Sequence, residues 1–170
     1  MHDHQQMDHS QHEGEGTPIE YLKFAGVILF IVLVSLFLYN QFGNSFTDWM
    51  RYFMGVFFVV FAGFKFLDLP GFVSSYIGYD IIAKRSMFYA QSYPFIELAL
   101  GLMYLFGSSW VDYITLPLMT IGAIGVLQQL LKRSKIKCAC LGTYIKLPLT
   151  TVSLVEYLLM GVMAAYMIFM

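Results

Sequence analysis

Charged side chains are scarce in this chain. Asp, Glu, Lys and Arg make up only 12% of its 170 residues, whereas hydrophobic residues make up 58%. Soluble domains are roughly a quarter charged, so this chain has too little charge to cover a surface that faces water. Most of its surface must therefore face lipid or other apolar segments. The net charge of −1, without a basic stripe, gives no support to a nucleic-acid binder.

Cysteine is almost absent as well. The two cysteines, Cys138 and Cys140, exclude a disulfide framework. The first sixteen residues are polar and acidic, with no basic n-region, and no small-residue cleavage site follows the first apolar run. We therefore expect that run to be an uncleaved anchor. No glycine-rich phosphate loop follows a strand, so nothing indicates a nucleotide site.

Long hydrophobic runs are what the chain has instead. A transmembrane helix needs about 20 apolar residues, and the runs predict an all-α integral membrane helical bundle. The segment 71–86 is too broken by glycine, serine and charge to span, so we expect a loop or interfacial segment there. Ser153 and Glu156 match a capping box, which predicts the start of the last helix. The five expected spans are 21–39, 49–69, 87–106, 113–131 and 154–170.

The distribution of Lys and Arg predicts the orientation. Short loops on the cytoplasmic side carry an excess of these residues. The loop that contains the cysteines holds five of them, and the loops at 40–48 and 107–112 hold none. We therefore expect the N-terminus and the cysteine loop to be cytoplasmic. Four expected spans separate these two segments, and an even number of crossings places them on the same side whatever the absolute orientation.

Two charges fall inside the expected spans. A charge at the bilayer centre costs about 2.5–3.5 kcal/mol even on insertion scales. We expect Glu97 to face the interior of the bundle with a partner, and Lys65 has a side chain long enough to reach it. A structural ion pair, a protonated Glu97 and a functional site all remain open. Arg51 lies just inside the second span.

The cysteine pair can carry chemistry. In an extended backbone, residues i and i+2 share one face, so Cys138 and Cys140 can chelate one soft metal ion or close a strained disulfide. Lys135 and Lys137 favour the thiolate. Redox chemistry, metal binding and a plain loop with two small residues all remain open.

The N-terminal tail, 1–18, is rich in histidine. It has no apolar periodicity, so we expect it to be disordered. Its spacing predicts a metal-binding tract for copper, zinc or nickel. Because this tail and the cysteine loop share a side, the two could act on the same metal ion. The candidate metal ligands are His2, His4, His9, His12, Cys138 and Cys140.

Four short motifs resemble one membrane protein family. RYFMG (51–55), FAGFK (61–65) and PFIELALGL (94–102) resemble helix patterns of DoxX-like membrane proteins. CACLG (138–142) resembles the C-x-C-F-G motif of the MauE branch, the methylamine utilisation membrane protein family. Leu141 stands where that motif has Phe. The histidine-rich tail is not part of the family pattern.

The resemblance implies a DoxX-like four-helix membrane domain over 49–170 in a bacterial inner membrane. The anchor, 19–40, and the tail look like additions. MauE-like proteins are associated with thiol–disulfide handling during maturation of methylamine dehydrogenase, alongside a thioredoxin-like partner. The resemblance implies a redox pair, Cys138 and Cys140, and buried polar residues, Arg51, Lys65 and Glu97.

Three functions therefore remain. The first is a thiol–disulfide protein of the bilayer that exchanges electrons with a thioredoxin-like protein or a quinone. The second is a membrane protein that handles copper or zinc with its tail and its cysteines. The third is a structural membrane subunit.

Overall fold

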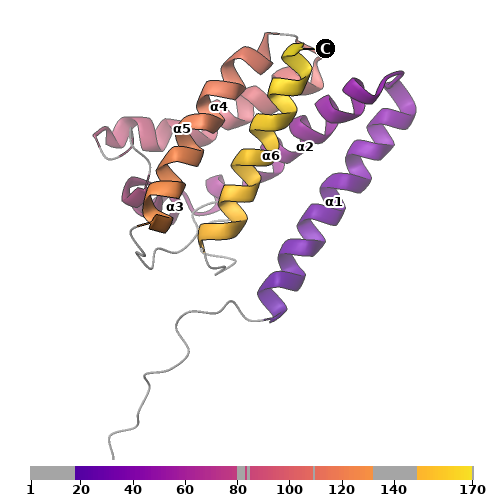
Figure 1. Cartoon of the computed structure of the whole chain (residues 1–170). Helices are drawn as coiled ribbons and strands as arrows, with labels where there is room; N and C mark the ends of the chain where they lie inside the picture. The colour runs from indigo at the N-terminus through magenta and orange to yellow at the C-terminus, as the bar shows by residue number, and fades with distance from the viewer. Residues whose placement is uncertain (1–17, 80–82, 84, 109, 132–148, 170) are drawn as a thin grey trace, which may run out of the picture.

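The chain is a bundle of helices (Figure 1). The computed structural model describes residues 18–79, 83, 85–108, 110–131 and 149–169. Within these ranges the elements are α1 (Pro18–Phe42), α2 (Phe46–Leu67), α3 (Leu69–Tyr79), α4 (Met87–Leu105), α5 (Val111–Leu131) and α6 (Leu149–Phe169). The tail histidines and both cysteines lie outside the described residues.

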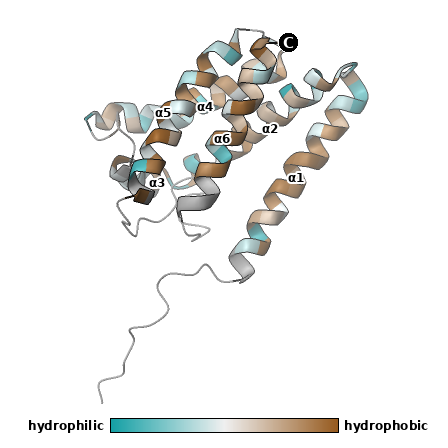
Figure 2. Cartoon of the chain, in the orientation of Figure 1, coloured by the Kyte–Doolittle hydropathy of each residue, from teal (hydrophilic) through white to brown (hydrophobic). Residues whose placement is uncertain are grey.

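The chain is a helical membrane protein. By length and composition, three stretches of the described helices can cross a bilayer: Tyr21–Phe42, Phe46–Leu67 and Val111–Gln128. Brown, hydrophobic residues run along these helices in Figure 2. The other long helices, α4 and α6, have 19 and 21 residues. Each packs against a helix that meets the criterion, α4 against α2 and α6 against α5. Three of the five expected spans thus meet the criterion within the described residues, and the other two stay predictions.

The helices α2 and α4 form an antiparallel pair. Gly55, in the first half of α2, lies against Gly101 and Leu105 near the end of α4. Lys65, in the last turn of α2, contacts Glu97 in the middle of α4. Residue numbers therefore rise along one helix as they fall along the other.

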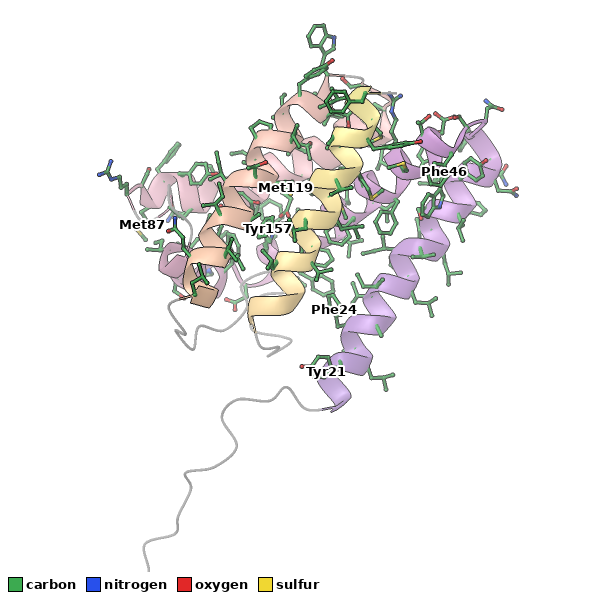
Figure 3. The ribbon with its side chains drawn as sticks, viewed as in Figure 1. Tyr21, Phe24, Phe46, Met87, Met119 and Tyr157 are labelled. Carbon is green, nitrogen blue, oxygen red and sulfur yellow. The ribbon has the colours of Figure 1, made fainter. Side chains whose placement is uncertain are left out.

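A second antiparallel pair is formed by α5 and α6. Gly122 lies against the ring of Tyr157, and Met119 lies near Gly161. Figure 3 labels Met119 and Tyr157 where the two helices meet. The remaining long helix, α1, packs on α2 after a tight connection, where Asp48 accepts hydrogen bonds from the backbone N–H groups of Asn44 and Ser45.

These directions give the bundle two distinct ends. Tyr104, near the end of α4, contacts Asp112 at the beginning of α5. Tyr93, near the start of α4, contacts Tyr157 in the first half of α6. It follows that the beginnings of α1, α4 and α6 and the ends of α2 and α5 lie together with α3. We call this the α3 end, and we call the opposite end the turn end.

Two sequence expectations need correction. The segment 71–86, expected to be a loop or interfacial segment, is no plain loop: it is helical up to Tyr79, with Pro70 in the first turn of α3, and at 11 residues this helix is too short to span. The last helix does not begin at a capping box. The helix begins at Leu149, so Ser153 lies inside α6 and is not its N-cap residue.

Candidate functional site

A buried ion pair connects α2 and α4. Lys65 and Glu97 are each only 2% exposed. The Lys65 ammonium donates to both carboxylate oxygens of Glu97, at 2.6 and 2.5 Å. A buried ion pair is tolerated only with such close geometry, because both groups lose their hydration. The partner that the sequence predicts for Glu97 is therefore present.

Aromatic rings enclose the ammonium group. Lys65 Nζ lies 5.4 Å from the centroid of Phe72 and 5.1 Å from that of Tyr93. Tyr76 stacks between them, 5.0 Å from Phe72 and 4.6 Å from Tyr93. Ring faces attract a cation and exclude water. The charge of Lys65 is thus stabilised by the Glu97 carboxylate and by two ring faces, that of Phe72 from α3 and that of Tyr93 from α4.

The short helix α3 is held over this pair by a compact junction. Asp68 separates α2 from α3, and its side chain accepts a hydrogen bond from the backbone N–H of Gly71 at 3.0 Å. A Cβ atom at Gly71 would collide with the Asp68 carboxylate. Glycine therefore leaves room for the Asp68 side chain beside the first turn of α3. The helix α3 then places Phe72 over Lys65, and Tyr76 stacks on Phe72. The sequence shows this glycine but not the reason for it.

Close contact of the backbones brings α2 and α4 together. A Cβ atom at Gly101 would lie 3.0 Å from the carbonyl oxygen of Gly55 and 3.0 Å from the backbone nitrogen of Val59. Small residues allow helices to approach in this way. Gly63, in contrast, has no atom within 4 Å of such a Cβ. The glycines of the first and third helix motifs thus have a packing role, and packing gives no reason for Gly63.

Tyr93 connects the buried ion pair to α6. Its side chain shares a hydrogen bond with Tyr157, and Glu156 lies close enough to interact with it electrostatically. Tyr93 and Tyr157 are 2% and 5% exposed. Polar contacts at the α3 end therefore join the α2/α4 pair to the α5/α6 pair. The capping role that the sequence gives to Glu156 does not apply.

A second polar cluster lies at the turn end. The Tyr104 hydroxyl donates to the Asp112 carboxylate at 2.9 Å, and both residues are buried. Arg51 is half-buried and interacts electrostatically with both side chains. Sequence reasoning placed Arg51 at the membrane but missed Tyr104 and Asp112. The expected span started at Tyr113, whereas α5 starts at Val111, which puts Asp112 in its first turn.

The structure brings together some of the candidate residues and not others. Lys65 and Glu97 meet, while Arg51 belongs to the separate cluster at the turn end. In the part of the chain that the structure describes, no three His, Cys, Asp or Glu side chains gather as a metal ion would require. The predicted redox pair, Cys138 and Cys140, and the predicted ligands, His2, His4, His9 and His12, lie outside the described residues.

The fold and these clusters define a class: a multi-pass helical membrane protein with a buried Lys–Glu ion pair. The model of the family described as methylamine utilisation protein MauE matches residues 43–170. The chain therefore belongs to the MauE family. The match begins directly after α1 (Pro18–Phe42) and includes all four motifs. Searches of the curated proteins and of the solved structures found no match.

Proposed function

We propose that this protein exchanges electrons by thiol–disulfide chemistry at the membrane, through Cys138 and Cys140. The observation that supports the proposal is that the two helices flanking these cysteines in the sequence, α5 and α6, meet at one end of the bundle. The helix before the pair, α5, ends at the α3 end of the bundle, and the helix after it, α6, begins there. Membership of the MauE family supports the same role.

The reaction is a two-electron exchange with a protein disulfide. One thiolate of the pair attacks the disulfide of a thioredoxin-like protein, which forms a mixed disulfide and releases one partner thiolate. The second cysteine, as a thiolate, then attacks the mixed disulfide. A Cys138–Cys140 disulfide forms, and the partner leaves as a dithiol, with the two protons of the original pair. The reverse direction uses the same steps.

Within this proposal the buried residues have a scaffold role. Lys65 and Glu97 fix α2 against α4, and Tyr93 and Tyr157 fix the second helix pair against the first. These contacts lie at the same end as the two helix ends that flank the cysteines. Arg51 acts in the corresponding cluster at the turn end. The residues therefore hold the platform from which the thiols act.

Trapping the mixed disulfide tests the redox role. The variant Cys140→Ser lacks the second thiol, so a partner attacked by Cys138 stays attached. We expect a species of higher mass on non-reducing gels of native membranes, and we expect dithiothreitol to remove it. The double variant Cys138→Ser/Cys140→Ser is the control. Thiols that stay reduced across the whole glutathione redox range, with no such species, would show that the pair is not redox-active.

A second candidate function is the handling of copper or zinc. The observation that favours it is that α1 begins at the same α3 end, so the histidine tail and the cysteine segment are attached to one end of the bundle. The thiolates and imidazoles suit soft or borderline metal ions.

Metal content distinguishes this second function. We expect purified protein to hold stoichiometric copper or zinc, to lose it in Cys138→Ser and to bind it more weakly when residues 1–16 are deleted. Metal that remains in both variants would rule out this candidate. The mixed-disulfide result is independent of that outcome.

A further inference from the structure

A groove runs along the seam between α1 and α2. Its volume is about 550 Å³. The two helices are antiparallel here, so the first turns of α1 lie beside the last turns of α2. Residues spaced by three or four positions line both walls, as expected for one stripe of each helix. The lining includes Lys23, Gly26 and Phe30 of α1, and Val60, Phe64 and Leu67 of α2.

The groove opens toward the bilayer. Phe30 and Leu67 are 56% and 66% exposed, so its walls end at the lipid-facing surface. A Cβ atom at Gly26 would have no atom within 4 Å, so this glycine leaves open space in the groove. Figure 1 shows that α1 and α2 diverge from the connection between them toward the beginning of α1. A long apolar chain fits a space of this shape and polarity.

One charge stands at the α3 end of the groove. Among the described residues that line the groove, Lys23 alone is charged; it is exposed, and it lies about one turn after the start of α1. This position corresponds to the depth of the lipid headgroups. Among the side chains that the structure describes, which begin at Tyr21 in α1, no carboxylate forms an ion pair with Lys23. The groove therefore offers an ammonium group at one end and hydrocarbon along the rest.

We propose that this groove binds one anionic phospholipid, with its phosphate paired to Lys23 and an acyl chain along Gly26 and Phe64. Basic pockets between transmembrane helices are known to bind anionic headgroups. The charge decides between lipids, because apolar walls alone would accept any acyl chain. The site depends on α1, which lies before the family match at 43–170. It is therefore a property of this chain's additional helix, and it does not depend on the proposed redox function.

Native mass spectrometry of the full chain tests the site. The protein, delipidated in detergent, is titrated with phosphatidylglycerol or with phosphatidylcholine of the same acyl chains. We expect phosphatidylglycerol to bind about five-fold more tightly, the size of effect that one lysine has on anionic lipid. We expect Lys23→Gln to remove this preference, and Gly26→Leu to weaken both lipids by filling the groove.

The control is Arg85→Gln, which removes an exposed cation at the α3 end but on the side of the bundle away from α1, as the position of Met87 in Figure 3 shows. We expect it to leave the preference unchanged. Equal binding of the two lipids to the unmodified chain, a preference that survives Lys23→Gln, or binding that ignores Gly26→Leu would overturn the proposal. So would a dimer, without lipid, that Gly26→Leu dissociates. Unchanged helical content of Lys23→Gln and Gly26→Leu, measured by circular dichroism, excludes misfolding.

Discussion

Gly55 of α2 and Gly101 of α4 meet backbone to backbone, and a Cβ atom on Gly101 would lie 3.0 Å from the Gly55 carbonyl oxygen. This contact sets the distance between the two helices, and Lys65 and Glu97 meet a few turns away along the same interface. Glycine at both positions is therefore a condition for the ion pair.

Replacing Gly101 by leucine should separate these helices. The new side chain has only backbone and Val59 in front of it, so α4 must move away from α2. We expect a loss of about 3 kcal/mol in stability, at the upper end of the usual cost of overpacking, because backbone atoms cannot move aside as a side chain can. Thermal unfolding in detergent measures it. The matched control is Gly63→Leu, where the space is open, and equal losses in the two variants would contradict the close-contact account.

Removing one member of the ion pair should destabilise the bundle more than removing both. Lys65→Met leaves Glu97 buried without its partner, and such changes cost about 3–5 kcal/mol. In Lys65→Met/Glu97→Met the orphaned charge is gone, so most of the stability should return. Chemical unfolding in detergent measures both. If the double variant is no more stable than Lys65→Met, lost packing and not lost charge pairing explains the effect.

The hydroxyl of Tyr104 should matter and that of Tyr113 should not. Tyr104→Phe removes the hydrogen bond to the buried Asp112 carboxylate, and hydrogen bonds to charged groups contribute about 1.5–3 kcal/mol. Tyr113 is 58% exposed and lies next to Asp112 on α5, so Tyr113→Phe is the control. Unfolding temperatures in detergent compare them. Equal shifts would mean that the Tyr104–Asp112 contact does not stabilise the turn end.

Impermeant thiol labelling should place the tail and the cysteines on one membrane face. Each chain keeps or gains a single cysteine, and the others are replaced by serine. We expect the chain with His4→Cys and the chain with the natural Cys138 to react from the same side of oriented vesicles. Asn44→Cys, in the exposed connection between α1 and α2 at the turn end, should react from the other side. Labelling of His4→Cys and Cys138 from opposite faces would end the metal-handling candidate and change the count of spans.

The sequence predicted the long helices because their signal is local. Apolar runs near the length of a bilayer are visible without any knowledge of neighbours. The ion pair could also be predicted, because a carboxylate such as Glu97 in a span requires a partner. The MauE motifs led to the family that the match to 43–170 establishes.

What the sequence did not predict depends on contacts between distant residues. The helix α3 contains two glycines and two serines, which gave the expectation of a loop or interfacial segment, yet Phe72 packs over Lys65 and Tyr76 stacks on Phe72. Tyr104 lies within the expected span 87–106 and Asp112 within the expected loop 107–112, and only the contact between α4 and α5 brings them together. The capping box failed because Ser is also acceptable within a helix, and local pattern does not fix a boundary.

The ion pair also has a consequence for biogenesis. Lys65 and Glu97 are 32 residues apart, so α2 leaves the ribosome well before α4 is complete. Until then a lone ammonium group sits at the edge of the hydrocarbon, and α2 is a poor candidate for independent release from the insertion machinery. The two helices should leave the translocon together, and a chain truncated before α4 should be recognised and degraded by membrane proteases.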